Sequence, residues 1–166
     1  MNIFVLHDDP VQAAKYHCDR HVVKMILETG QMLSTALHHA KFHHSALYKP
    51  AFDNHPCNIW VRHSNENFIW TVTLFQALGE EYTYRYGKLH KTIDQLTPAL
   101  NLALYANLFP DRGLTQRPLC MPDHHKTYPT AVECYRSYYH DKLHFAAYTH
   151  REWPEWLLKL PKELHA

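Results

Sequence analysis

The sequence predicts an all-α fold, as one compact domain over residues 1–166 with four to five helices and little or no sheet. Glycine is scarce, with 4 residues, whereas the 10 prolines mark joints between apolar segments. Long segments repeat apolar residues three and four positions apart, which is the spacing of one helix face. Apolar residues make up 46% of the chain, which is enough for one buried core.

The elements follow from this periodicity and from the prolines. In chain order, the sequence predicts a short strand or extended lead-in over 2–6, helices over 11–17, 19–39, 56–86, 97–108 and 128–148, and a last short turn over 153–160. A capping residue before a proline is typical of a helix start. Such starts are Asp9–Pro10, Asn54–His55–Pro56, Thr97–Pro98 and Tyr128–Pro129. The polar segment 40–55 and the proline-containing segment 111–127 are predicted loops.

Composition limits where the protein works and what it binds. The four cysteines form no CxxC pair, and the start of the chain is too short and too acidic for a signal peptide. We therefore expect reduced thiols in a cytoplasm. No run of 18 apolar residues occurs, so no membrane partner is expected. The formal charge of +1 gives no global basic field, although local basic patches stay open.

The helix predicted over 19–39 confines its polar side chains to one line. At 100° per residue, a stripe beside its apolar face contains His21, Lys24, Glu28, Gln31, Thr35 and His38. One interpretation is a solvated stripe with a Lys24–Glu28 ion pair one turn apart. The other is the lining of a cleft, in which Lys24 and Glu28 lose water and their pKa values become coupled. The scarcity of charges elsewhere on this helix favours the cleft.

Two segments alternate basic and aromatic residues. Arg85 and Lys88 follow several tyrosines, and Arg136 and Arg151 lie among tyrosines and a tryptophan. This alternation suits a phosphate backbone with stacked bases. The alternative is an ordinary amphipathic surface and, for Arg85, an internal pair with Glu81 that fixes helix packing.

The histidine count and the absence of several known motifs limit the classes of enzyme chemistry that we expect. Three HxxxH spacings occur, but chance predicts about one or two at this density, so they are weak evidence for a metal. The chain contains no GxGxxG, GxxxxGK[ST], GxSxG or HExxH motif. Dinucleotide-binding, P-loop, hydrolase-elbow and zincin chemistry are therefore not expected.

Several short blocks resemble small phage and bacterial proteins described as pyrimidine-dimer DNA glycosylase-like. The blocks are Asp9–Pro10, the helix from Asp19 through Lys24, Glu28 and Gln31, His55-Pro56-Cys57-Asn58-Ile59-Trp60, the piece from His124-His125-Lys126 through Tyr135-Arg136, and Arg151-Glu152-Trp153-Pro154-Glu155-Trp156. Together the blocks touch about half of the chain. A phage origin would place the protein in the host cytoplasm.

The resemblance implies a helical fold, DNA as partner and no cofactor. It also implies an amine that attacks C1′ of the sugar, assisted by a helix-borne glutamate at the position of Glu28. An α-amino group has a pKa near 8, so it is partly neutral at pH 7. In the family this amine belongs to a small residue exposed after removal of Met1, whereas residue 2 here is Asn. The nucleophile therefore stays open among the Met1 amine, Lys24 and a water activated by Glu28.

We therefore expect a DNA glycosylase or lyase that acts on damaged or modified bases. Glu28 is the expected acid or base, Lys24 a cation or imine former, and His21 and His55 handle protons or phosphate. The residues expected to hold backbone phosphate are Arg85, Lys88, Arg136 and Arg151. An aromatic-lined pocket would receive the flipped base.

Two alternatives come from other functional classes. The first is a metal-dependent enzyme that acts on a nucleotide or nucleic acid, in which a divalent metal is held by His17, His21, Glu28 and His55. The second is a non-enzymatic phage accessory protein that binds a host protein or DNA. In that protein the polar stripe would be a hydrogen-bond network that fixes helix packing.

Overall fold

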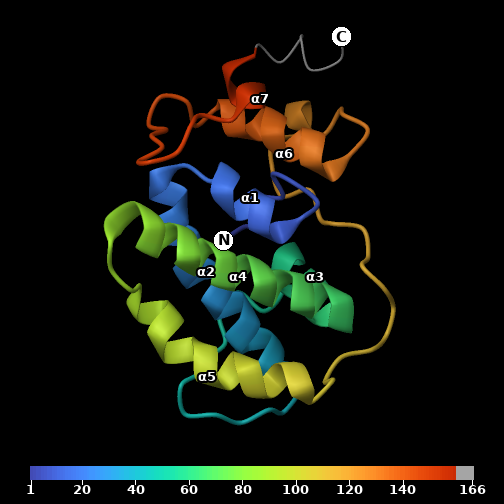
Figure 1. The fold of residues 1–166 in the computed structure, drawn as a ribbon. Helices are drawn as coiled ribbons and strands as arrows, with labels where there is room; N and C mark the ends of the chain where they lie inside the picture. Colours follow the sequence, from blue (N-terminus) through green and yellow to red (C-terminus); the bar gives the residue numbers. More distant parts are fainter. Residues whose placement is uncertain (160–166) are drawn as a thin grey trace.

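The computed structural model describes residues 1–159, and all regular structure over this range is helical (Figure 1). The elements are α1 (Pro10–Tyr16), α2 (Asp19–His39), α3 (Pro56–His63), α4 (Asn65–Tyr86), α5 (Lys91–Tyr105), the 3-10 turn η1 (Asp123–His125), α6 (Ala131–His140) and α7 (Glu155–Leu158). The all-α prediction is confirmed, with more helices than the four to five expected. None of these helices is long and apolar enough to cross a membrane.

The first two helices begin and end close to where the sequence places them. The side chain of Asp9 accepts a hydrogen bond from Val11 N at 2.9 Å, and Pro10 occupies the first position of α1. This is the expected cap followed by a proline. Helix α2 spans the predicted residues 19–39 and buries one apolar face along its whole length.

The long helix predicted over 56–86 is two helices with a break at Ser64. Ser64 has extended backbone angles, and its hydroxyl accepts a hydrogen bond from Asn67 N at 3.0 Å. A serine side chain that binds a nearby N–H offers the backbone an alternative to the helical bond, so the chain restarts as α4. Helix α4 then ends at Gly87, whose φ of 66° is left-handed.

Helix α5 starts earlier than predicted, and α6 is shorter. His90 caps α5 through its ring, so the helix begins at Lys91 and carries Pro98 in its interior. Helix α6 begins after Thr130, which forms a capping box with Glu133, and ends at His140 instead of continuing to residue 148. The last predicted turn corresponds to α7, and position 160 of that prediction lies outside the described residues.

The segment 3–6 has no regular secondary structure and pairs with no strand in the described part of the chain, and Leu6 N donates a hydrogen bond to Phe4 O at 3.0 Å. Its four residues are at most 6% exposed, and they run through the centre of the helical assembly. The Nε of Arg136 donates to Leu6 O at 3.0 Å, and the ring of Phe4 lies in contact with those of Tyr139 and His21. This buried segment brings the first residues of the chain against α2 and α3.

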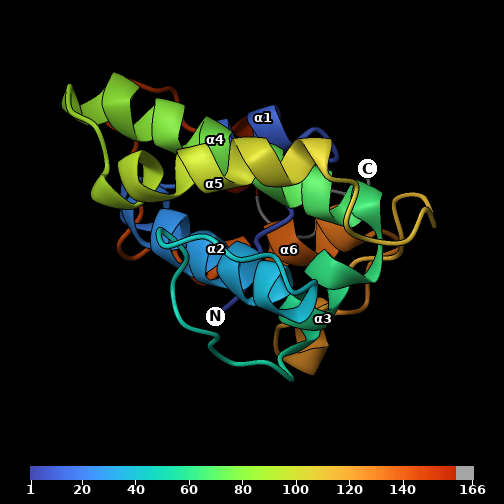
Figure 2. The same ribbon diagram turned by 90° about the horizontal axis from the view of Figure 1, so that it is seen from below.

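Helices α2, α4 and α5 form the larger part of the core, with α6 and α7 at the opposite end of the molecule (Figures 1 and 2). Gly30 allows α2 and α5 to approach closely. A Cβ at this position would lie 2.8 Å from Leu96 Cδ1 and 3.0 Å from Thr92 Cγ2. A larger residue would therefore require the side chains of Leu96 and Thr92 to shift.

Candidate active site at the amino terminus

Glu28 of α2 lies where the first residues of the chain end. Its Oε2 accepts a hydrogen bond from Asn2 N at 3.1 Å and lies 3.7 Å from the α-amino nitrogen of Met1. The Glu28 side chain is 14% exposed, so water reaches this carboxylate only in part. The carboxylate thus holds the first peptide unit and the terminal amine together.

The Met1 side chain is buried while its main chain is not. The side chain is only 2% exposed, yet the residue as a whole is partly exposed, so its exposed part is the main chain that carries the α-amine. Asn58 Nδ2 contacts the Met1 sulfur at 3.3 Å and donates to Ala51 O at 2.9 Å. These contacts bury the thioether and leave the main chain of Met1 partly exposed beside Glu28.

Lys24 supplies a second amine to the same carboxylate. Its Nζ lies 3.4 Å from Glu28 Oε1, and its side chain is 63% exposed. The two residues are one turn apart on α2, so the ion pair expected from their spacing is present. Glu28 therefore binds one amine through each carboxylate oxygen.

His55 also belongs to this group. It precedes α3, where its Nδ1 accepts a hydrogen bond from Cys57 N at 3.2 Å. Partial burial lowers the pKa of His55, the positive charge of the amino terminus lowers it further, and Glu28 opposes both. Of the four predicted catalytic residues, Lys24, Glu28 and His55 thus gather around the Met1 amine.

His21, the fourth predicted catalytic residue, lies elsewhere with His17. It is about 10 Å from Glu28 along the helix axis, because they are seven residues apart. The ring of His21 stacks on Phe4, and its Nδ1 shares a hydrogen bond with Tyr139 OH at 2.9 Å. Burial is the largest cause that lowers the pKa of His17 to about 4 and of His21 to about 3. Both are therefore neutral core residues at pH 7.

The four residues of the alternative metal site predicted from the sequence therefore lie in two separate places. His17 and His21 lie together in the core, whereas Glu28 and His55 lie at the amino terminus. Among the described residues, two groups of three ligand atoms are close enough for a metal, and neither contains His17, His21 or Glu28: they are His55–Cys57–Cys120 and His124–His125–Asp141.

The polar stripe of α2 is mostly covered by other parts of the chain. Glu28 receives the amino-terminal segment, Thr35 Oγ1 accepts from Ala51 N at 3.1 Å, and His38 Nε2 lies 2.9 Å from Tyr48 O. Hydrogen bonds to Thr35 and His38 of this stripe therefore hold the loop 40–55 in position. A solvated stripe would require its side chains to project into solvent. Among the residues of the stripe, only Lys24 does so.

Arg85 is an internal residue. Its guanidinium is fully buried and donates to Glu81 at 3.1 Å, to Asp19 at 2.9 Å and to His17 O at 2.8 Å. Every bond points inward, so this group is not placed to contact DNA phosphate. The internal Glu81–Arg85 pair weighed from the sequence is the arrangement observed.

The other predicted phosphate-binding residues are placed differently from one another. Arg151 donates to both oxygens of Glu81, at 2.6 and 3.1 Å, and Arg136 donates to a main-chain oxygen of the buried amino-terminal segment. Lys88 is exposed. These residues lie on separate elements, and only Lys88 has its charge fully at the surface.

Cations lie along the face of α2 that carries Glu28. Arg20, Lys24 and Glu28 follow at four-residue intervals on α2 and so share a helix face. Lys142 joins Arg20 and Lys24 in lowering the pKa of His21, after burial and His17, so each of these cations lies within electrostatic reach of His21. The spacing of Arg20 and Lys24 was visible in the sequence, whereas the approach of Lys142 required the fold.

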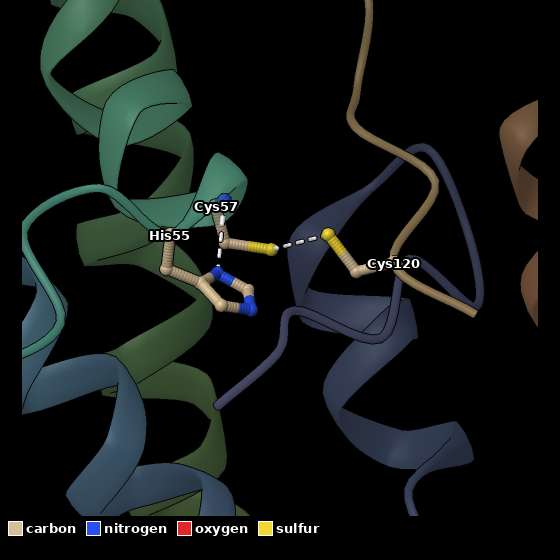
Figure 3. Close-up of side chains that lie close together, drawn as sticks. All are labelled: His55, Cys57 and Cys120. Carbon is tan, nitrogen blue, oxygen red and sulfur yellow. Dashed lines mark hydrogen bonds between the residues drawn. The ribbon is translucent and has the colours of Figure 1, made fainter.

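Two cysteines meet beside the same segment (Figure 3). Cys57 Sγ lies 3.6 Å from Cys120 Sγ and 3.7 Å from Asn2 Oδ1. Asn2 in turn donates to Cys120 O at 2.8 Å and accepts from Tyr135 OH at 3.2 Å. Cys57 and Cys120 are 63 residues apart, so no local pattern announced this contact.

A second polar group fixes η1 against α6. His125 Nδ1 lies 2.9 Å from Ser137 Oγ, and its Nε2 lies 2.8 Å from Asp141 Oδ2. Ser137 is 5% exposed, and the Asp141 side chain is 47% exposed. The group therefore joins two elements.

No protein-family model, curated protein or solved structure matches this chain. The function is therefore argued from the geometry at Glu28 and from the chemistry that its neighbours allow.

Proposed function

We propose that this protein is an amine-based DNA glycosylase or lyase that acts on damaged or modified bases. The observation that carries the proposal is the contact of Glu28 with the Met1 amine at 3.7 Å and with the Lys24 amine at 3.4 Å. The family resemblance of the sequence implies the same pairing of an amine with a helix-borne glutamate. The proposal assigns the reacting amine to Met1.

The chemistry needs a neutral amine next to a base. The amine attacks C1′ of the deoxyribose, the glycosidic bond breaks and the base leaves with its electron pair. Sugar-ring opening then gives a protonated imine. Removal of a C2′ proton by Glu28 expels the 3′ phosphate and cleaves the strand. An amine nucleophile and an adjacent carboxylate are the two groups that these steps require.

Met1 fits the nucleophile better than Lys24. As a class, α-amines have lower pKa values than lysine side chains, so a larger fraction is neutral at pH 7. The first peptide unit is also held by the 3.1 Å hydrogen bond from Asn2 N to Glu28, whereas the Lys24 side chain is 63% exposed. A fixed nucleophile loses less entropy in reaching the sugar.

The charge around Glu28 suits a DNA backbone. Arg20 and Lys24 are exposed on the face of α2 that carries Glu28, and Lys142 acts electrostatically on His21 of the same helix. Cations next to a reactive amine attract phosphate without reading sequence. Lys24 thus acts in the proposal as a phosphate-binding cation.

The test is borohydride trapping on oligonucleotides that contain an abasic site, a thymine dimer or a modified pyrimidine. We expect a covalent protein–DNA adduct with the abasic strand and with at least one of the base lesions. Glu28→Gln should lower the strand-cleavage rate by about 100-fold or more, because it removes the proton acceptor. Glu80→Gln, on exposed α4 surface, is the matched control and should leave the rate unchanged. No adduct with any strand would overturn the proposal.

Peptide mapping of the adduct identifies the amine. We expect the label on Met1, with Lys24→Ala still forming the adduct but binding DNA less tightly. Lys15→Ala, which removes an exposed lysine of α1, is the control for loss of one charge. Acetylation of the amino terminus should abolish the adduct. A label on Lys24 would keep the imine chemistry but reject Met1 as the nucleophile.

A further inference from the structure

We propose that His55, Cys57 and Cys120 bind a divalent metal of the zinc class. This inference goes beyond the imine chemistry and does not depend on it. The three residues come from the start of α3 and from the loop before η1, and they converge beside the amino-terminal segment (Figure 3). Two sulfur ligands and one imidazole nitrogen are a donor set that zinc sites use.

The distances suit tetrahedral coordination. One ligand atom from each residue lies within 4.8 Å of the others, and the two sulfurs are 3.6 Å apart. Zn–S bonds of about 2.3 Å at a tetrahedral angle place two sulfurs about 3.8 Å apart. The sulfur pair therefore already has the required separation, and only the imidazole must move closer.

The main chain fixes both cysteines. Cys57 follows Pro56 in the first turn of α3 and is buried. Cys120 N donates to Tyr135 OH at 3.3 Å, and Cys120 O accepts from Asn2 Nδ2 at 2.8 Å. A ligand that is held in place through its backbone needs little reorganisation to bind a metal.

His55 can exchange one contact for another. Its Nδ1 accepts a hydrogen bond from Cys57 N at 3.2 Å, which is long for this type of bond. A metal bound through Nδ1 would replace that bond, and Nε2 would then carry the ring proton. The nitrogen that faces the cysteine residue is thus the one that becomes the ligand.

The two thiols contact each other directly. Cys57 Sγ donates a hydrogen bond to Cys120 Sγ at 3.6 Å. A metal would displace the thiol protons, as thiolate coordination requires. Two thiolates and one divalent ion leave no net charge in this partly buried position.

Three protein ligands leave one coordination position for water or a substrate atom, as in catalytic zinc sites. The Met1 ammonium and Glu28 both influence the pKa of His55, so the site adjoins the candidate active site. A disulfide between the cysteines is the competing state. It needs the sulfurs to approach to about 2.05 Å and an oxidant to remove two electrons, and it makes no use of His55.

The experiment titrates the full, reduced protein with Co²⁺, which reports thiolate ligation through a charge-transfer band and tetrahedral geometry through its visible bands. We expect one ion per chain, displaced by Zn²⁺. Bound Zn²⁺ should also protect Cys120, the partly exposed thiol of the pair, from alkylation in the native protein. This second readout needs no variant, so a folding defect cannot obscure it.

Ligand variants complete the test. Cys57→Ser, Cys120→Ser and His55→Gln should each weaken Co²⁺ binding by at least about 100-fold, since even second-layer changes cost 10- to 100-fold. Cys134→Ser and His63→Gln, which alters an exposed histidine of the same helix, are matched controls and should bind normally. Absence of the charge-transfer band in wild type would overturn the site, as would undiminished binding by His55→Gln. Borohydride trapping in the presence of a chelator tests the imine chemistry separately.

Discussion

Arg85 illustrates what a single charged residue does in this core. Its guanidinium is fully buried, and it joins Glu81, Asp19 and main-chain oxygens before α2. Burying a charge costs several kcal/mol unless its partners are complete. Here the partners are complete, so Arg85 is expected to matter for stability and not for contact with DNA.

Arg85→Met should therefore lower the free energy of unfolding by about 3–5 kcal/mol, because it removes the buried cation that Glu81 and the partly buried Asp19 share. Lys88→Met, three residues away and exposed, should change it by less than about 0.5 kcal/mol. Urea denaturation of the two variants measures both values. A loss below about 1 kcal/mol for Arg85→Met would show that the carboxylates find other partners.

The buried histidines predict how stability depends on pH. Burial, and then Arg85, lower the pKa of His17 from 6.5 to about 4, although a hydrogen bond to Ala13 opposes this. The unfolded chain therefore binds a proton between pH 6.5 and pH 4 that the folded chain does not. Stability is full above pH 6.5 and falls as the pH decreases, by about 2 kcal/mol between pH 7 and pH 5 from His17 alone.

His17→Leu isolates this contribution. The difference in unfolding free energy between pH 7 and pH 5 should become about 2 kcal/mol smaller in the variant than in wild type. His43→Leu removes a histidine that is exposed in the folded chain and should leave the difference unchanged. An unaltered difference in His17→Leu would mean that His17 accepts its proton in the folded state near neutral pH.

At the scale of single elements, α5 carries an internal proline. Pro98 is exposed and stands eight residues into a helix of 15, where it cannot donate a hydrogen bond to residue 94. Pro98→Ala should stabilise the protein by about 1–3 kcal/mol, because it restores this bond and removes no buried surface. Thermal unfolding measures the change.

Pro10→Ala is the control, since proline at the first position of α1 has no helical bond to restore. This variant should give no gain. A fall in stability for Pro98→Ala would show that α5 depends on contacts of the proline ring.

The helix boundaries show what could be read from local sequence. Apolar spacing placed α2 correctly, because that pattern is continuous over 21 residues. The break at Ser64 and the start of α5 after His90 were missed, because a serine inside a periodic pattern and a histidine cap are weak signals. In both cases one side-chain hydrogen bond to the backbone decides the boundary.

The candidate site was predictable to a similar extent. Lys24 and Glu28 were found because they lie one turn apart on a helix that carries few other charged residues. The Met1 amine and Cys120 reach the site only through the buried segment 3–6 and the loop before η1. The contacts of Asn2 with Glu28 and of Cys57 with Cys120 join residues 26 and 63 positions apart, and the periodicity of the sequence does not indicate contacts of this kind.

At the scale of the whole molecule, the net charge is small, so the positions of the cations matter more than their number. The formal charge is +1, so attraction of DNA would depend on where cations cluster. Arg20 and Lys142 lie close to His21 on one side, and each also lies over an aromatic ring, at 4.5 Å from Phe145 and 4.1 Å from Tyr138. This side is the expected backbone-binding surface.

Arg20→Glu combined with Lys142→Glu should weaken binding to an abasic duplex and reduce the salt dependence of log K by about two phosphate contacts. Lys15→Glu combined with Lys49→Glu makes the same change in net charge on exposed residues elsewhere and should leave the salt dependence nearly unchanged. Fluorescence anisotropy at several salt concentrations measures both slopes. Equal losses in the two variants would show that only net charge matters.

The buried amino-terminal segment also constrains the order of events during synthesis on the ribosome. Asn2 contacts Tyr135, and Leu6 contacts Arg136, so these residues reach their partners only after at least 130 further residues have been made. Contacts this distant along the chain form late and slowly. The nascent chain must therefore keep an apolar segment without these neighbours while the helices between them are made.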